Sequence, residues 1–346
     1  MKLKSLTIFL ATLMSLQFSA CVSTDVVDQP DSSKSDPDLI VLKIGKPETI
    51  GTRADDGYKL RYVAKIFKGS NAAAWEGVAY RQEIIEGEGD DKMVFKVEPD
   101  QTYGILVFAD YIPSDYTADP STGLYKDYFY NTASTGNEVP NGKRVAMRLT
   151  PGTANGNTPK YSKDFFNNPY YDAFFASEIV EKKKEEKIVD MELKRITAKV
   201  IFRDNSAVNE NASIKIKKLG SIMYFDMNAS AAFQNAQAVN VSNVELNYDA
   251  TGTTEEEKDL FYFYTFASPN QELKVVSATF SVTTDTEGEN REISEIPVRS
   301  NYKTIVKGEF LHAEPEIDEP DPEPEDGDLI LNLSKDTSWE LETLGK

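Results

Sequence analysis

Alternation of apolar and polar residues with a period of two runs through most of the chain, which is the pattern of half-buried β-strands. In residues 59–67, KLRYVAKIF, Leu60 and Tyr62 begin an apolar face, and Lys59, Arg61 and Lys65 fall on the opposite face. Residues 103–112 are almost continuously apolar, which is typical of a central strand. Further strand patterns cover residues 78–85, 92–97, 143–151, 213–217, 239–246, 260–267, 273–283, 293–298 and 300–312.

Short strands separated by turn-rich segments favour antiparallel β-sandwiches over helical folds. The segments EGEGDD and DTEGEN are typical of hairpin connections. We therefore predict an all-β protein with two tandem antiparallel β-sandwich domains, at residues 54–187 and 188–313. The apolar positions change phase near Arg195, which predicts a bulge or a bend there. Residues 165–181 are rich in aromatic side chains and predict a short helix or turn that packs on a sheet.

The first 20 residues have the layout of a secretory signal peptide. Lys2 and Lys4 precede an apolar core of about a dozen residues, which is too short to span a bilayer stably. Small residues then precede Cys21, as in lipoproteins, where this thiol is acylated. The alternative is an ordinary cleaved signal in which Cys21 is incidental. Acylation is the better interpretation because Cys21 is the only cysteine, and a free thiol in an exported protein would be reactive.

Two further segments flank the predicted sandwiches. Residues 21–53 begin as a polar, acidic tether and then contain an apolar strand pattern from Leu39 to Ile44, with Arg53 behind it. Residues 314–346 join a proline- and acid-rich linker to a second apolar strand. Three of its residues share one face: Leu329, Leu331 and Leu333. A detached apolar strand of this kind needs a sheet edge or a groove to cover it.

The strongly acidic composition excludes one class of partner. The formal net charge is −19, and it becomes more negative when Lys2 and Lys4 leave with the signal peptide. Nucleic-acid binding requires a basic surface, so we expect no nucleic-acid partner. Electrostatic docking on anionic lipid is disfavoured for the same reason.

Candidate residues for catalysis or metal binding are scarce. His312 is the only histidine, and a surface position at the end of a strand explains it better than a Ser-His-Asp triad. One cysteine and one histidine exclude a Cys/His metal cluster. The acidic runs 86–91 and 318–328 could hold calcium weakly, but they lack EF-hand spacing, and solvated loops are the better interpretation. We therefore expect no enzymatic activity, no metal and no cofactor.

An aromatic cluster offers a different kind of site. Trp75 and the tyrosines around Tyr128 could form a platform on which a glycan stacks. Aromatic side chains buried in a sandwich core are the commoner explanation.

Four segments together resemble the fimbrillin family of Bacteroidales-type bacteria, the type V pilins and their lipoprotein relatives. They are FSAC at the end of the signal, GTRADDGYKLRYVAKIF around Arg53, MELKRITAKVIF in the middle and IPVRSNYKTIVKGEFL near the C-terminus. The resemblance covers most of the chain, and the last segment is the most telling.

The resemblance implies two transthyretin-like, Greek-key β-sandwich domains and export to the outer-membrane surface as an acylated, palmitate-bearing lipoprotein. It also implies that an arginine-specific protease cuts between Arg53 and Ala54 and removes the strand Leu39 to Ile44. The strand Leu329 to Leu333 of a neighbouring subunit would fill the groove, satisfying its exposed backbone and apolar side chains. Such a contact is head-to-tail and propagates as a filament. The partners are then other fimbrial subunits and the lipoprotein-processing machinery.

The sequence favours one function and leaves one alternative open. The first is a cell-surface fimbrial subunit or adhesin that assembles by donor-strand exchange after proteolysis. The alternative is a glycan-binding surface lipoprotein associated with polysaccharide uptake, in which exposed aromatic residues such as Trp75 contact the glycan.

Overall fold

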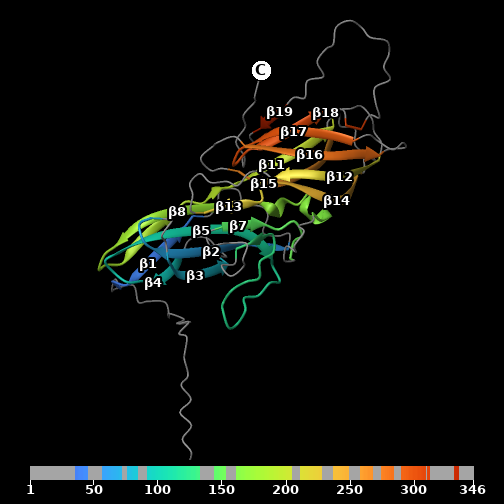
Figure 1. Ribbon diagram of the computed structural model, residues 1–346. Coiled ribbons are helices and arrows are strands. Elements are labelled where there is room, and N and C mark those ends of the chain that lie inside the picture. The colour runs from blue at the N-terminus through green and yellow to red at the C-terminus, as the bar shows by residue number, and fades with distance from the viewer. Residues whose placement is uncertain are drawn as a thin grey trace, which may run out of the picture. The chain divides into compact units, whose positions relative to one another are not determined.

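The computed structural model of the chain is built from β-strands (Figure 1). It describes residues 36–45, 57–71, 76–84, 92–132, 144–152, 161–204, 211–227, 237–248, 258–267, 274–283, 290–308, 310–311 and 331–334. Strands and single-turn 3-10 helices are the regular elements of this part of the chain, which confirms the predicted all-β class. No helix within it has the length and apolar character needed to cross a membrane. Several predicted site residues fall outside it: Cys21, Arg53, Ala54, Trp75, His312, Leu329 and the acidic runs 86–91 and 318–328.

The first large sheet is antiparallel and has the order β10-β8-β5-β2-β3. Its strands are β2 (Tyr58–Lys68), β3 (Glu76–Ile84), β5 (Gln101–Pro113), β8 (Ala173–Lys182) and β10 (Lys194–Arg195). The apolar run of β5 is central, as predicted, because it pairs with β2 on one side and β8 on the other. The short helix or turn predicted over residues 165–181 is found only in its first part, as two 3-10 turns, η3 (Lys163–Phe165) and η4 (Pro169–Tyr171). For residues 173–181 the prediction is wrong, because they pair with β5 as part of β8.

A three-stranded sheet, β4-β1-β9, completes the first sandwich. It consists of β4 (Lys92–Lys96), β1 (Leu39–Ile44) and β9 (Lys187–Met191). The middle strand β1 runs antiparallel to β4 and parallel to β9. The boundary predicted between residues 187 and 188 therefore cuts through β9. Its pairing with β1 assigns this strand to the first sandwich, and pairing with a strand so distant in sequence leaves no local pattern.

The second half of the chain forms two further sheets, in the orders β15-β11-β18-β19 and β14-β12-β16-β17. Their strands are β11 (Thr197–Asp204), β12 (Ala212–Ser221), β14 (Gln237–Tyr248), β15 (Lys258–Phe266), β16 (Lys274–Thr283), β17 (Asn290–Val298), β18 (Lys303–Gly308) and β19 (Leu331–Ser334).

Both halves repeat one strand arrangement. The order β4-β1-β9 corresponds to β15-β11-β18, and β8-β5-β2-β3 corresponds to β17-β16-β12-β14. The strand directions match as well, since β1 is parallel only to β9 and β11 only to β18. A register shift interrupts the equivalent strands β2 and β12. In this correspondence β11 is the counterpart of β1, and β19 is an addition beyond β18.

A small sheet links the two halves of the chain. It has the order β13-β7-β6, with β6 (Tyr130–Asn131), β7 (Arg144–Met147) and β13 (Tyr224–Asp226). Phe225 of β13 packs edge-on against Phe175 of β8, with ring centroids 4.9 Å apart. The small sheet therefore covers one face of the first large sheet with residues from both halves.

The phase change near Arg195 marks a passage between sheets. The chain leaves β9 at Met191, pairs briefly with β8 through β10, and enters the second set of sheets at Thr197. The side chain of Arg195 is buried there, and its Nε donates to both carboxylate oxygens of Asp172 at 2.9 and 3.1 Å. Thr197 Oγ1 donates to the same carboxylate at 2.8 Å. The predicted bend is therefore a crossing held by a buried ion pair.

Candidate functional site

The strongest candidate site is the space between β4 and β9 that β1 fills, which we call the β1 slot. Ile40 and Leu42 have no exposed surface, and Ile44 is 3% exposed. These three side chains join the main hydrophobic core. On the other face of the strand Leu39 and Val41 are also buried, and Lys43 alone is exposed. β1 therefore buries apolar side chains on both faces, as a strand inside a core does.

Apolar side chains from both neighbours form the walls of the β1 slot. Ile40 lies opposite Phe95 of β4, and Leu42 lies opposite both Met93 of β4 and Val189 of β9. Residues directly opposite one another in a sheet point to the same face. The wall residues on the core face are all buried: Met93, Phe95, Val189 and Met191.

Hydrogen bonds fasten both ends of β1. Before the strand, the Asp38 carbonyl accepts from Val97 N at 2.8 Å, beyond the end of β4. After the strand, Gly45 N donates to the Met191 carbonyl at 3.1 Å. The Lys182 ammonium is buried at the end of β8 and donates to the Pro37 carbonyl just ahead of β1. The register of β1 is thus fixed from three other strands.

β1 is joined to the other described strands through the chain on one side only. It comes first among these strands, and residues 45–57 carry the chain on to β2. Arg53 and Ala54 belong to this connection in sequence. A single break in it would separate β1 from every later strand.

The predicted donor strand lies in the second set of sheets. β19 pairs antiparallel with β18 of its own chain, with Leu331 opposite Val306 and Leu333 opposite Thr304. It occupies the end of the sheet β15-β11-β18-β19. The C-terminal strand thus pairs with β18 of its own chain, and its insertion into the groove of a neighbouring subunit stays a prediction.

A buried charge network, which the sequence analysis placed on the polar face of a strand, lies next to the first sandwich core. Arg61 has no exposed surface, and its Nε and Nη2 donate to the two carboxylate oxygens of Asp110 at 2.9 and 2.7 Å. Its Nη1 donates to Asp127 at 2.8 Å. Lys65 is 3% exposed and donates to the Thr132 carbonyl at 2.9 Å. The expectation that Arg61 and Lys65 face solvent is therefore wrong, because the loop after β5 folds over them.

The ion pairs and hydrogen bonds of this network stabilise the fold. Burial is the main cause that lowers the pKa of Lys65 to about 8; the Asp127 carboxylate opposes this shift, and the Arg61 cation contributes to it. Asp127 also accepts from the Thr132 amide and hydroxyl, both at 2.8 Å, so it ties the loop to itself and to Arg61. These groups hold residues 125–132 against the sheet.

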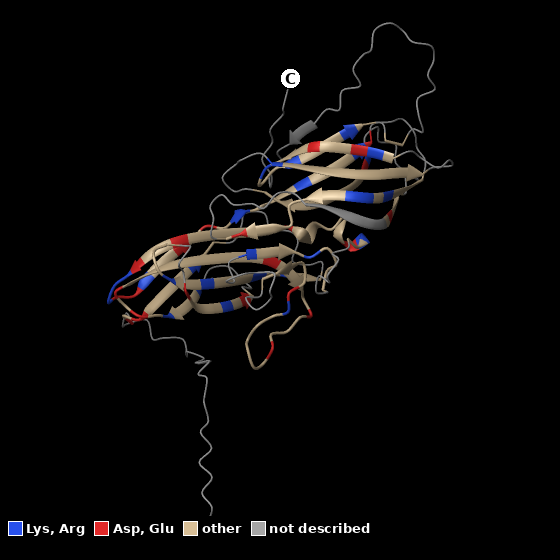
Figure 2. Ribbon diagram, viewed as in Figure 1, with Lys and Arg blue, Asp and Glu red and all other residues tan. Residues whose placement is uncertain are grey.

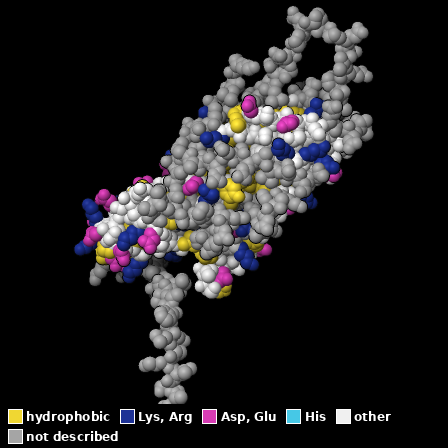
Figure 3. All heavy atoms as spheres, in the orientation of Figure 1, with side chains coloured by type: hydrophobic (Ala, Val, Ile, Leu, Met, Phe, Trp, Pro, Cys, Tyr) yellow, Lys and Arg dark blue, Asp and Glu magenta, His cyan; other side chains and the backbone are white. Residues whose placement is uncertain are grey.

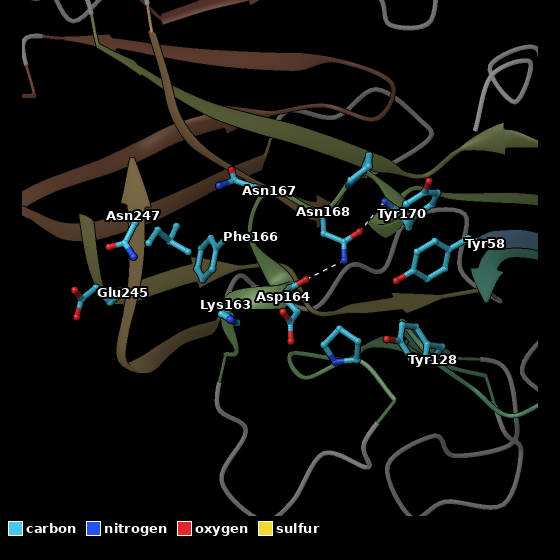
Figure 4. Close-up of a pocket in the computed structure, with 13 residues that line it drawn as sticks. Tyr58, Tyr128, Lys163, Asp164, Phe166, Asn167, Asn168, Tyr170, Glu245 and Asn247 are labelled. Atoms are coloured by element: carbon cyan, nitrogen blue, oxygen red, sulfur yellow. Dashed lines mark hydrogen bonds between the residues drawn. The ribbon is translucent and has the colours of Figure 1, made fainter. Parts of the chain in front are cut away.

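Tyr128 lies in a second candidate site, an open pocket of about 750 Å³ (Figure 4). Tyr58, Tyr128 and Tyr170 stand together at one end of the pocket. Polar residues of η3, the segment after it and β14 line the rest: Lys163, Asp164, Asn167, Asn168, Glu245 and Asn247. Sequence reasoning found Tyr128 and missed the others. They come from distant segments, and only the density of aromatic residues near 170 marked part of the site.

The surface of the described residues carries no single strong feature. Basic and acidic residues are interspersed along the strands of both sandwiches (Figure 2). Hydrophobic side chains reach the surface in small patches (Figure 3), and the large ones with about half their area exposed are spread over four strands. These are Val78, Ile179, Ile188 and Val275. Within the described segments, no three His, Cys, Asp or Glu side chains gather closely enough to hold a metal ion.

Comparisons with known proteins give similarity of fold. A Bacteroides thetaiotaomicron protein proposed to bind polysaccharide (DUF1812) is 11% identical, with a TM-score of 0.46 over 81% of this chain and 99% of that one. The fimbrial anchor protein Mfa2 from Porphyromonas gingivalis is 12% identical, with a TM-score of 0.39 over 78% and 90%. A fimbrial assembly protein from Parabacteroides distasonis is 12% identical, with a TM-score of 0.38 over the same shares.

No curated protein matches the sequence. One family model matches residues 32–322, which include β1, both sandwiches and the start of the C-terminal linker. The chain belongs to this family, which is described as a family of unknown function (DUF6562).

Proposed function

We propose that the chain is a cell-surface fimbrial subunit or fimbrillin-like adhesin that assembles by exchanging β1 for a strand of a neighbouring subunit. The observation that carries the proposal is the place of β1. It is an interior strand of its sheet, yet it comes first among the described strands, and its chain connection to the other described strands runs through residues 45–57 only.

Loss of β1 would leave an open groove between β4 and β9 into which another strand could bind. The facing edges of β4 and β9 would each lose a row of hydrogen-bonding partners, and their buried apolar side chains would be uncovered. A supplied strand satisfies backbone and side chains at once, which is the principle of β-strand addition. The donor and acceptor surfaces differ, so each contact is head-to-tail and the product is a chain of subunits.

Cleavage after Arg53 is the trigger in this proposal, and Cys21 is the acylated anchor. Before cleavage the precursor stays closed and attached to the outer membrane by its lipid. After cleavage the segment that contains both Cys21 and β1 is free to leave. The donor is the C-terminal strand, in which Leu329, Leu331 and Leu333 repeat the spacing of the core-facing residues of β1. Other fimbrial subunits are then the partners, and an arginine-specific protease acts on the chain.

The test treats the purified precursor with an arginine-specific protease and follows oligomers by electrophoresis in mild detergent. We expect a ladder of detergent-resistant species from the native chain. Arg53→Ala should abolish the ladder, and Arg291→Ala, which changes an arginine on β17, should leave it intact. Leu331→Asp should permit cleavage but stop the ladder, because a carboxylate would have to enter an apolar slot. Complete cleavage after Arg53 that yields only monomers would overturn the proposal.

A further inference from the structure

The pocket beside Tyr128 has an aromatic end whose shape is fixed by stacking. The rings of Tyr58 and Tyr170 are stacked, with centroids 4.1 Å apart and planes 29° from parallel. Tyr128 lies 6.1 Å from Tyr58 and packs edge-on against Phe129 at 4.7 Å. Tyr170 is nearly buried, but Tyr58 and Tyr128 are only half-buried. Part of each of these two rings is therefore available to a ligand at the pocket wall (Figure 4).

The middle of the pocket is a turn that its own hydrogen bonds hold rigid. Asn168 Oδ1 accepts from Tyr170 N at 3.0 Å, and its Nδ2 donates to the Asp164 carbonyl at 3.0 Å. Asn167 has a left-handed backbone, with φ +54°, and its Oδ1 accepts from Tyr262 N at 2.9 Å. The turn is thus tied to β15, and the polar wall of the pocket is built before any ligand arrives.

The far end of the pocket presents exposed hydrogen-bonding groups of both kinds. Lys163 and Asp164 come from η3, and Glu245 and Asn247 come from β14. All four side chains are exposed. Carboxylates accept, the ammonium donates, and an amide does both, so this end can match a ligand with many hydroxyl groups.

The balance of charge narrows the ligand class. The pocket has one cation, Lys163, against two carboxylates, Asp164 and Glu245, in a chain of net charge −19. A phosphate or another anion would meet net repulsion there. A neutral ligand with an apolar face and hydroxyl edges fits both ends, and the volume is in the range of small-ligand sites.

We propose that this pocket binds a neutral oligosaccharide. One sugar ring stacks on the exposed side of Tyr58 and Tyr128, and the hydroxyl groups of the following residues bond to Asp164, Glu245 and Asn247. The site is distinct from the β1 slot, since no residue of β1, β4 or β9 lines it. An adhesin with this site recognises a glycan through its own body.

The test is titration calorimetry of the purified chain that is uncut at Arg53 and so keeps β1, with gluco-, manno-, galacto- and xylo-oligosaccharides, and with oligogalacturonate as the anionic comparison. We expect at least one neutral series to bind and oligogalacturonate to bind more weakly. Tyr128→Ala should weaken binding at least tenfold, and Tyr128→Phe, which keeps the ring, should weaken it less. Asn247→Ala removes an exposed amide without disturbing the core and should weaken binding severalfold.

Tyr224→Ala is the matched control, because this half-buried tyrosine of β13 does not line the pocket. Binding should be unchanged in it. The proposal is overturned if no neutral oligosaccharide binds at millimolar concentration, or if Tyr128→Ala and Asn247→Ala both bind as the native chain does. It is also overturned if a synthetic peptide of residues 325–346 occupies the pocket and saccharides do not displace it, since the site would then bind a protein segment.

Discussion

Removal of β1 is the perturbation that tests the β1 slot most directly. In a chain that begins at Ala54, the slot loses five buried apolar side chains: Leu39, Ile40, Val41, Leu42 and Ile44. At about 1.5–3 kcal/mol for each fully buried side chain, the loss is about 8–15 kcal/mol. Domains are stable by about 5–15 kcal/mol in total. The truncated chain should therefore not keep a folded first sandwich by itself.

The assay is urea unfolding of the truncated chain, followed by far-ultraviolet circular dichroism, with and without added peptides. We expect a peptide of residues 36–45 to restore cooperative unfolding of the first sandwich. The same peptide with Leu42→Asp should fail, because this position has no exposed surface. Lys43→Asp should still restore it, because Lys43 is the exposed residue of the strand.

One result would refute the reasoning. If the chain that begins at Ala54 is monomeric and unfolds at the same urea concentration as the full chain, β1 does not hold the sandwich together. Restoration by a peptide of residues 326–336 would be the further sign that the C-terminal strand fits the slot.

Three other predictions concern single residues. Because burial lowers the pKa of Lys65 to about 8, the unfolded chain keeps the proton of this ammonium group to higher pH than the folded chain does. The free energy of unfolding, relative to that of Lys65→Met, should therefore rise by about 2 kcal/mol from pH 8 to pH 10. A difference in urea unfolding that does not change with pH would contradict this. Lys182→Met removes the donor to the Pro37 carbonyl and should cost about 1–3 kcal/mol and speed amide exchange in β1, whereas Lys183→Met, an exposed neighbour, should change neither. Gly220→Ala should cost about 1–3 kcal/mol in urea unfolding, because a Cβ there would lie 2.5 Å from the hydroxyl of Ser277 on β16; the cost should shrink when that serine is also replaced by glycine.

The strands could be predicted from the sequence wherever one period-two pattern faces one core. β2, β15 and β16 lie close to their predicted positions for this reason, and β5 does so because its run is almost continuously apolar. The apolar segment from Leu39 to Ile44 was predicted as a strand, and its length and position match β1.

Sequence patterns failed where a covering element comes from far along the chain. Arg61 and Lys65 alternate with apolar residues as solvent-facing residues do, yet the loop that ends at Thr132 buries both. Their ion pairs and hydrogen bonds are what make this burial tolerable, since an unpaired buried charge is costly. The partners Asp110 and Asp127 are separated from Arg61 by 49 and 66 residues, so no local sequence pattern predicts these ion pairs.

The pocket beside Tyr128 could not be predicted from the sequence either, because its residues come from distant segments of the chain. Its aromatic end combines Tyr58 at the start of β2 with Tyr128 in a loop and Tyr170 in η4, and its polar end combines η3 with β14. Each of these residues by itself is an ordinary surface or core residue. Only the folded chain gathers them.

The repeated arrangement of strands confines the proposed strand exchange to one of the two sandwiches. β11 is the counterpart of β1 and is likewise flanked by one antiparallel and one parallel neighbour. However, β11 lies between β10 and β12 in the chain, so a single cut could not free it. β18, the counterpart of β9, already carries β19 on its outer side. Among the described strands, one cleavage could free β1 but not its counterpart β11, and β19, the strand proposed as the donor, follows the second sandwich and pairs with β18 there. A filament that grows in one direction needs this asymmetry, because a subunit with two open slots or two donors would branch.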